Sequence, residues 1–251
     1  MLKIIQVGHD DASDRYIRNK VKAVEAAGMK AEIINLPYES PTFEVVNVVR
    51  LMNDLPSTSA IIVQLPLPNH IDKKAVLSSI YPELDIDGLN PKSDYKPLTP
   101  CAIMRWLVDD EEVDLEGKNV VIFGRSELVG KPLANMMIDA GATVTVLNSK
   151  TSDYTRRCAC VDVDVVVSAV GKPNTIPADY LYYSDYHKPP IVIDVGINRD
   201  ENGKLCGDVS TKARNVIEKL GGICTPVPGG VGKWTVRELV LRLKEMEGIH
   251  D

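Results

Sequence analysis

Short apolar runs alternate with amphipathic stretches along most of the chain. The short, mostly apolar run LKIIQVG, residues 2–8, predicts a buried strand. In residues 13–28 the apolar positions instead recur every three or four residues and stop at Gly28, which predicts an amphipathic helix. Strands that alternate with helices indicate parallel sheets with helices on their faces. The pattern therefore predicts an α/β protein.

The alternation forms two series separated by a turn-rich segment. The first series consists of strands over residues 2–8, 31–37 and 60–68 and helices over residues 13–28 and 42–54. Prolines end its third strand, AIIVQLPLP, because proline cannot donate to a sheet. After the turn-rich DIDGLNPKSDYKPLTP, the second series consists of strands over residues 119–126, 142–149, 163–171 and 190–198 and a helix over residues 128–140. We expect two α/β units, the second entered near residue 101 and left near residue 225.

The composition excludes several classes of protein. With 251 residues, 44% of them hydrophobic and 25% charged, the chain is typical of a soluble globular protein and unlike disordered, collagenous or coiled-coil sequences. A net charge of -6 argues against nucleic acid as a partner. No signal peptide or long apolar span is present, so we expect no membrane attachment.

The five cysteines indicate free thiols rather than disulfides or a metal site. Their number is odd and none of them forms a Cys-x-x-Cys pair. Free thiols are typical of a reducing compartment, so we expect a cytoplasmic protein with no structural zinc.

A phosphate-binding turn is predicted in the second series. In VVIFGRSELVG a buried strand runs directly into Gly124, and Ser126 and Gly130 follow before an apolar helix. This is the strand, turn and helix context of dinucleotide binding, in which exposed backbone N–H groups face a pyrophosphate. Gly124 permits a tight turn and Gly130 permits close packing of helix on strand. Ser126 stands in place of the middle glycine of G-x-G-x-x-G.

The end of the next strand favours NADP over NAD. NAD sites usually place a carboxylate there to bond the ribose 2′-hydroxyl, whereas arginine and small polar groups accommodate a 2′-phosphate. The strand here ends in Asn148, Ser149 and Lys150, with Arg125 in the preceding turn. The structural alternative is that these are solvated loop residues.

Tyr16 and Lys20 are candidate substrate-facing residues of the first unit. They lie four residues apart on the helix predicted over residues 13–28 and therefore share one face. Taken alone, this spacing is more typical of an ordinary structural helix. A Tyr-x3-Lys pair also occurs in short-chain dehydrogenases, but there the glycine-rich turn comes first. The reversed order places the pair in a separate substrate-facing unit that precedes the nucleotide unit.

A series of motifs gives the chain a family resemblance. The chain carries, in this order, Ser13, Tyr16 and Lys20, then VQLPLP, DIDGLNP, LTP, GRSELVGKP, AVGKP, DVGIN and TPVPGGVG. In this order they resemble the bifunctional methylenetetrahydrofolate dehydrogenase/cyclohydrolase family over nearly the whole chain. The resemblance implies two α/β lobes with parallel sheets, the second a Rossmann-like NAD(P)-binding domain, and an active-site cleft between them. It implies a folate-binding catalytic domain over residues 1–101 plus 233–251 and an NADP-binding domain over residues 102–232.

The resemblance also implies an activity in one-carbon metabolism. Family members oxidise 5,10-methylenetetrahydrofolate to the methenyl form with NADP and hydrolyse the product to 10-formyltetrahydrofolate. We therefore expect tetrahydrofolate derivatives as substrates, NADP as the cofactor and a homodimer formed through the nucleotide unit. No metal is required for this chemistry.

Three residues are implied to be catalytic. Lys20 matches the family's proton-transferring lysine, which needs a depressed pKa to exchange protons near neutral pH. Gln64 matches the residue that orients this lysine, and Asp87 matches the carboxylate that accepts the N–H groups of the pterin. Tyr16 matches the residue that stacks on the folate ring. The structural alternatives are an exposed helix cation for Lys20, core packing for Tyr16 and a turn former for Asp87.

The resemblance also implies further residues that bind the substrate and the cofactor. Further substrate-binding positions are Ser13, Leu65, Pro228 and Gly229. The implied cofactor-binding positions are Gly124, Arg125, Ser126, Val129, Gly130, Ser149, Val195, Ile197 and Thr235.

The chain departs from the family's pattern in three places. It begins closer to the first strand, its segment between Asn90 and Thr99 is short, and Lys233 and Trp234 stand where the family has Pro-Met. We expect Lys233 and Trp234 to add charge and bulk beside the cleft. A dehydrogenase without the hydrolase step, using NADP or NAD, and a non-catalytic nucleotide-binding regulator therefore stay open. The presence of Lys20 and Gln64 argues against the first alternative. The presence of Tyr16, Lys20, Gln64 and Asp87 together argues against the second.

Overall fold

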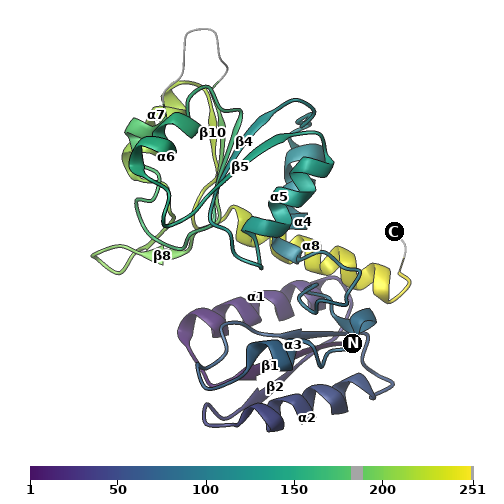
Figure 1. Cartoon of the computed structure of the whole chain (residues 1–251). Helices are drawn as coiled ribbons and strands as arrows, with labels where there is room; N and C mark the ends of the chain where they lie inside the picture. The colour runs from purple at the N-terminus through teal and green to yellow at the C-terminus, as the bar shows by residue number, and fades with distance from the viewer. Residues whose placement is uncertain (182–188, 250–251) are drawn as a thin grey trace. The chain divides into compact units, whose positions relative to one another are not determined.

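The computed structural model describes residues 1–181 and 189–249. Residues 182–188 of the predicted second domain and residues 250–251 of the predicted first domain lie outside the described residues. The chain forms two compact units, one of Met1–Leu98 with Val236–Asp251 and the other of Thr99–Thr235 (Figure 1). We call them unit 1 and unit 2. No helix in the described part of the chain is long and apolar enough to cross a bilayer.

Unit 1 is built on a small parallel sheet in the order β2-β1-β3. Its central strand is buried along its whole length, as predicted, with Lys3 and Gln6 buried along with the apolar residues. Leu2 of the central strand lies opposite Ala31 on one side and Ala60 on the other. The strands are β1 (Leu2–Val7), β2 (Ala31–Leu36) and β3 (Ala60–Val63).

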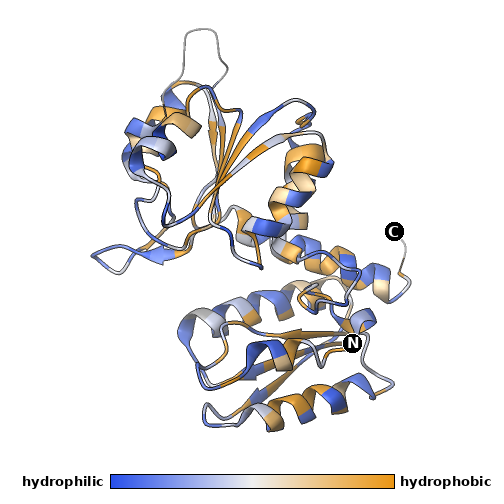
Figure 2. Ribbon diagram, viewed as in Figure 1, coloured by the Kyte–Doolittle hydropathy of each residue, from blue (hydrophilic) through white to orange (hydrophobic). Residues whose placement is uncertain are grey.

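Helices cover both faces of this sheet, and successive residues of β1 alternate between them. Leu2 and Ile4 pack with α1 and with the end of α8, whereas Ile5 and Val7 pack with α2 and α3. Figure 2 shows the strands of both units as largely apolar. The helices are α1 (Asp11–Ala26), α2 (Thr42–Asn53), α3 (Lys73–Leu77) and α8 (Val231–Met246), with a 3-10 turn η1 (Pro82–Leu84).

Unit 2 is built on a five-stranded parallel sheet in the order β10-β7-β6-β4-β5. From β4 the chain goes first to β5 on one side and then to β6 on the other, so the carboxyl end of β4 is a topological switch point. The strands are β4 (Asn119–Phe123), β5 (Thr143–Leu147), β6 (Val165–Ser168), β7 (Ile191–Asp194) and β10 (Ile223–Cys224), with a hairpin of β8 (Asn198–Arg199) and β9 (Leu205–Cys206).

The helices of unit 2 also pack on two faces. One core joins the sheet to α4 and α5, and the other joins it to α7 and to the segment after α6. The helices are α4 (Leu98–Arg105), α5 (Gly130–Asp139), α6 (Asp153–Ala159) and α7 (Thr211–Lys219), with a π-helical turn η2 (Trp106–Asp110) and a 3-10 turn η3 (Ala178–Tyr180).

Several predicted bounds need correction. The strands predicted over residues 119–126, 142–149, 163–171 and 190–198 end at Phe123, Leu147, Ser168 and Asp194. The strand predicted over residues 60–68 ends at Val63, and the helix predicted over residues 128–140 begins at Gly130, because residues 126–129 form the preceding turn. Trp234 packs against the core of unit 2 and stacks on Trp106, with ring centroids 4.2 Å apart and planes at 11°. Trp234 is therefore partly buried in unit 2.

Candidate active site

Lys20 and Gln64 are brought together in unit 1. Lys20 comes from α1 and is only 8% exposed, and its Nζ donates to Gln64 Oε1 at 3.2 Å. Gln64 directly follows β3, and its backbone N–H donates to the Ile5 carbonyl at 2.9 Å. The Gln64 Nε2 donates to the Leu65 carbonyl at 2.7 Å, which turns the amide oxygen toward the amine. The lysine is thus held by an oriented, uncharged acceptor.

Tyr16 and Ser13 lie on the same helix as Lys20. Ser13 is buried, and its backbone N–H donates to the Asp10 carboxylate at 3.1 Å. Tyr16 is half-buried, and burial raises the pKa of its phenol, so the ring stays neutral over the physiological range. A neutral, partly exposed aromatic ring is suited to stacking on a planar ligand.

The turn that carries Asp87 contains a second, buried carboxyl group. Asp87 itself is half-buried, but Asp85 is fully buried and accepts the Asn90 N–H at 2.6 Å through Oδ2. Asp85 Oδ1 has no hydrogen-bond partner among the described residues. Burial, together with the Asp87 carboxylate nearby, raises the pKa of Asp85 to about 6. The group is therefore protonated under mildly acidic conditions.

Asp85→Asn tests this titration. The pKa of Asp85 rises from 3.8 to about 6, so between these values the folded chain keeps a proton that the unfolded chain releases. Its contribution to stability is fully present below about pH 4 and is lost as the pH rises through about 6. We expect the wild type to lose on the order of 2 kcal/mol relative to Asp85→Asn between these pH values, measured by urea unfolding. A difference that does not change with pH contradicts the buried titration.

The glycine-rich turn of unit 2 lies at the switch point after β4. Gly124 has φ +109°, and a Cβ there would lie 2.5 Å from the Ala169 carbonyl oxygen. A Cβ on Gly130 would lie 2.2 Å from the Gly124 carbonyl oxygen, so the start of α5 rests directly on the turn. The Ser126 hydroxyl accepts the N–H groups of Val129 at 3.1 Å and Gly130 at 3.4 Å. A glycine at position 126 could not accept these hydrogen bonds, so the serine side chain stabilises the turn.

Arg125 and Ser149 occupy matching positions after two paired strands. Phe123 of β4 lies opposite Leu147 of β5, and each of the two residues lies two positions beyond this pair. Both side chains are exposed. The loop after β5 is fixed by Arg156, which donates to the Asn148 carbonyl at 3.1 Å. A cation and a hydroxyl at one edge, with no carboxylate in residues 148–151, fit a ribose 2′-phosphate.

The other predicted cofactor and substrate positions of unit 2 follow β7 and β10. Val195 is half-buried and Ile197 is 48% exposed after β7. Pro228 and Gly229 are exposed in the loop after β10. Thr235, on α8, donates through Oγ1 to the Val231 carbonyl at 3.0 Å.

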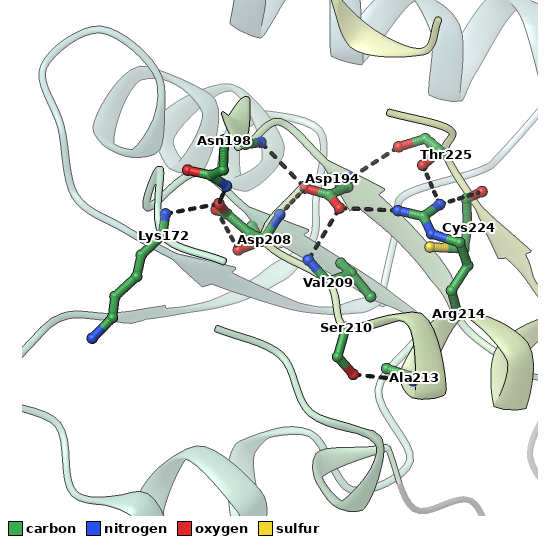
Figure 3. A network of polar contacts seen from close by, with 12 residues as sticks. Lys172, Asp194, Asn198, Asp208, Val209, Ser210, Ala213, Arg214, Cys224 and Thr225 are labelled. Atoms are coloured by element: carbon green, nitrogen blue, oxygen red, sulfur yellow. Dashed lines mark hydrogen bonds and ion pairs between the residues drawn. The ribbon is translucent and has the colours of Figure 1, made fainter. Parts of the chain in front are cut away.

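Two buried carboxylates fix the loops after β6 and β7 (Figure 3). Asp208 accepts five hydrogen bonds of 2.9–3.1 Å, from Ser168 Oγ, Asn198 Nδ2 and the backbone N–H groups of Val170, Gly171 and Lys172. Asp194 accepts the backbone N–H groups of Asp208 and Val209 and pairs with Arg214 at 3.0 Å. Burial raises the pKa of Asp194.

Asp194 and Asp208 are not among the residues predicted from sequence. Asp194 belongs to the DVGIN motif, but nothing in the spacing of the two aspartates indicates that they would meet. They bond to backbone N–H groups, which every residue type carries. No three His, Cys, Asp or Glu side chains of residues 1–181 and 189–249 come together as a metal site.

Comparisons with known proteins cover almost the whole chain. The catalytic domain of tetrahydrofolate dehydrogenase/cyclohydrolase matches residues 1–87, and the NAD(P)-binding domain of the same family matches residues 97–248. The bifunctional protein FolD of Cupriavidus necator is 42% identical over 97% of this chain and 86% of its own length.

Solved structures of the family share the fold. The bifunctional FolD of Campylobacter jejuni is 37% identical with a TM-score of 0.89, covering 98% of this chain and 87% of its own. The Trypanosoma brucei dehydrogenase-cyclohydrolase, solved with NADP and an inhibitor, is 32% identical with a TM-score of 0.86, covering 100% of this chain and 88% of its own. With both domains matched in order, this chain belongs to the tetrahydrofolate dehydrogenase/cyclohydrolase family.

Proposed function

We propose that the chain catalyses the NADP-dependent oxidation of 5,10-methylenetetrahydrofolate to 5,10-methenyltetrahydrofolate and the hydrolysis of that product to 10-formyltetrahydrofolate. Family membership supports both activities. The main structural support for the hydrolysis activity is the buried Lys20 amine, which is hydrogen-bonded to Gln64 at 3.2 Å. A regulatory protein that only binds nucleotide would have no need of an oriented, buried amine.

Unit 1 supplies the folate-binding residues of the proposed site. The Asp87 carboxylate accepts the N–H groups of the pterin, since an ionised carboxylate is an acceptor for paired donors. The Tyr16 ring stacks on the folate ring system, while Ser13 and Leu65 line the same end of the sheet. In unit 2, the proposed substrate-binding residues are Pro228 and Gly229, in the loop after β10.

Unit 2 supplies the nucleotide site. The turn that binds the pyrophosphate is formed by Gly124, Ser126, Val129 and Gly130. Because neither glycine has a Cβ, backbone N–H groups can face the pyrophosphate. Arg125 and Ser149 bind the 2′-phosphate, so NADP is the cofactor. Val195, Ile197 and Thr235 border the nicotinamide.

The oxidation step requires positioning alone. NADP, when bound, accepts a hydride from the methylene carbon, and the folate is left as the methenyl cation. No proton leaves the reacting carbon, so this step needs hydride donor and acceptor held in contact and no acid–base group.

The hydrolysis step requires proton transfer. Water adds to the cationic methenyl carbon, and the Lys20 amine accepts a proton from that water while Gln64 holds the amine in place. The lysine then returns a proton to N5 as the carbon–nitrogen bond breaks and the ring opens, and the added hydroxyl loses its proton to solvent as it becomes the formyl carbonyl. Overall, one water is consumed and one proton is released.

A spectrophotometric assay tests the dehydrogenase half and the choice of cofactor. Purified protein is incubated with 5,10-methylenetetrahydrofolate and either NADP or NAD, and reduced nicotinamide is followed by absorbance. We expect turnover with NADP and much slower turnover with NAD. Faster turnover with NAD contradicts the roles of Arg125 and Ser149. No turnover with either cofactor contradicts the proposed dehydrogenase activity.

We also propose a cytoplasmic homodimer formed through unit 2. The edge strand β5 leaves Val146 38% exposed, and an exposed edge strand is suited to pairing with a second copy. Light scattering of the purified chain is expected to give the mass of two chains. The mass of a single chain, unchanged over a range of protein concentrations, contradicts the dimer.

A further inference from the structure

Arg242 is a buried cation of unit 1 whose hydrogen bonds lead to the proposed substrate site. It lies on α8 and is 7% exposed. Its Nη1 donates to two carbonyl oxygens, that of Ile86 at 2.9 Å and that of Lys96 at 2.7 Å. The guanidinium carbon lies 5.2 Å from the centre of the Tyr95 ring, and Nη2 lies 3.8 Å from Glu238 Oε1.

The two carbonyls belong to the segments that hold Asp87. Ile86 immediately precedes Asp87, and Lys96 lies in the short segment between Asn90 and Thr99. These segments are in direct contact, because a Cβ on Gly88 would lie 2.5 Å from the Tyr95 carbonyl oxygen and 2.6 Å from that of Lys96. Gly88 also has φ +64°, which favours glycine. One guanidinium therefore clamps two closely packed backbone segments.

Asp87 is fixed on both sides by this arrangement. On its amino-terminal side Arg242 holds the Ile86 carbonyl, and the buried Asp85 carboxyl accepts the Asn90 N–H. On its carboxyl-terminal side Gly88 rests against the second segment. The Asp87 side chain is only half-buried, so its direction depends mainly on the backbone of the turn.

A purely packing role does not require this residue type. An apolar side chain could fill the space, whereas the rigid, always charged fork of arginine can hold two carbonyls at fixed positions. Burying the cation has a cost, which the carbonyls, the Tyr95 face and Glu238 offset. The contacts are therefore those expected of a residue that sets geometry.

We propose that Arg242 is a positioning residue for the folate substrate: by holding the Ile86 and Lys96 carbonyls, it sets the direction of the Asp87 carboxylate. The inference rests on the proposed function, in which Asp87 binds the pterin. It makes substrate affinity depend on a residue of the C-terminal helix that does not itself contact substrate.

Arg242→Met removes the donors while keeping a long side chain that suits a buried position. We expect the KM for methylenetetrahydrofolate to rise about 10-fold, with kcat and the KM for NADP changed less than about 2-fold. Arg242→Lys keeps a charged donor and should give a rise of about 3-fold. Arg237→Met, at an exposed arginine of the same helix, is the matched control and should behave as wild type.

A double-mutant cycle with Asp87→Asn separates positioning from general destabilisation. If Arg242 acts through Asp87, then Arg242→Met lowers kcat/KM for folate much less in the Asp87→Asn background than in the wild type. Equal factors in both backgrounds, or a KM for NADP that rises as much as that for folate, overturn the inference. If Arg242→Met does not fold, Arg242→Lys takes its place in the cycle. An Asp87→Asn variant with wild-type kcat/KM overturns the assignment of Asp87 itself, and with it the inference.

Discussion

Lys20→Met is expected to lower the rate of methenyltetrahydrofolate hydrolysis by at least about 100-fold, because general acid–base catalysis contributes about 10²- to 10⁴-fold. Methionine has a similar length but carries no proton, so it removes the transfer and little else. The position is 8% exposed, and a thioether is tolerated in a buried place better than an amine. The fold and the stability of unit 1 should therefore be retained.

The same variant should keep dehydrogenase activity, because hydride transfer needs no proton acceptor. Both reactions are followed in one cuvette, as formation of reduced NADP and decay of the methenyl absorbance. Lys22→Met, at an exposed lysine of α1, is the matched control and should retain both activities. Hydrolysis by Lys20→Met at the wild-type rate removes Lys20 from the mechanism.

Gly130→Ala is expected to destabilise unit 2 by about 3 kcal/mol and to abolish detectable NADP binding. The added Cβ would lie 2.2 Å from the Gly124 carbonyl oxygen, 2.7 Å from the Gly124 carbonyl carbon and 3.0 Å from the Arg125 Cα. All three are backbone atoms, which cannot rotate away as a side chain can. The start of α5 must move off the turn, and with it the backbone that faces the pyrophosphate.

A second glycine separates this clash from the general cost of replacing glycine. Gly171 has φ +71° and no neighbour within 4 Å of its ideal Cβ, so Gly171→Ala should cost only about 1 kcal/mol of backbone strain. Stability is measured by urea unfolding and cofactor binding by fluorescence titration with NADPH. If Gly130→Ala loses no more stability than Gly171→Ala and still binds NADPH, the inferred need for a close approach of α5 to the turn is contradicted.

Interior strands of both sheets could be predicted from sequence because they are buried on both faces. Short, mostly apolar runs such as VVIF and LKII identify β4 and β1 without any knowledge of their partners. β10 was not predicted, since a strand of two residues leaves no periodic signal. The helix α8 was not predicted either, because it begins inside the glycine-rich motif PGGVG.

The site could be predicted only where side chains follow a motif. Gly124 and Gly130 could be predicted because the local pattern of strand, turn and helix requires glycine at both positions. Lys20 and Gln64 lie 44 residues apart, and their contact depends on β1 pairing with β3. Only the family resemblance implied in advance that Gln64 orients Lys20. Asp208 and Arg242 act on backbone groups far away in sequence, so neither pattern nor motif marks them.

The most direct test is the stoichiometry of a single reaction. Wild-type protein is incubated with a limited amount of 5,10-methylenetetrahydrofolate and excess NADP, and NADPH and 10-formyltetrahydrofolate are quantified by absorbance and mass spectrometry. One chain with both activities should produce the two in equal amounts, with formyl product appearing much faster than the methenyl form hydrolyses without enzyme. NADPH accompanied by methenyltetrahydrofolate that accumulates and decays at the uncatalysed rate would contradict the bifunctional enzyme and leave a dehydrogenase alone.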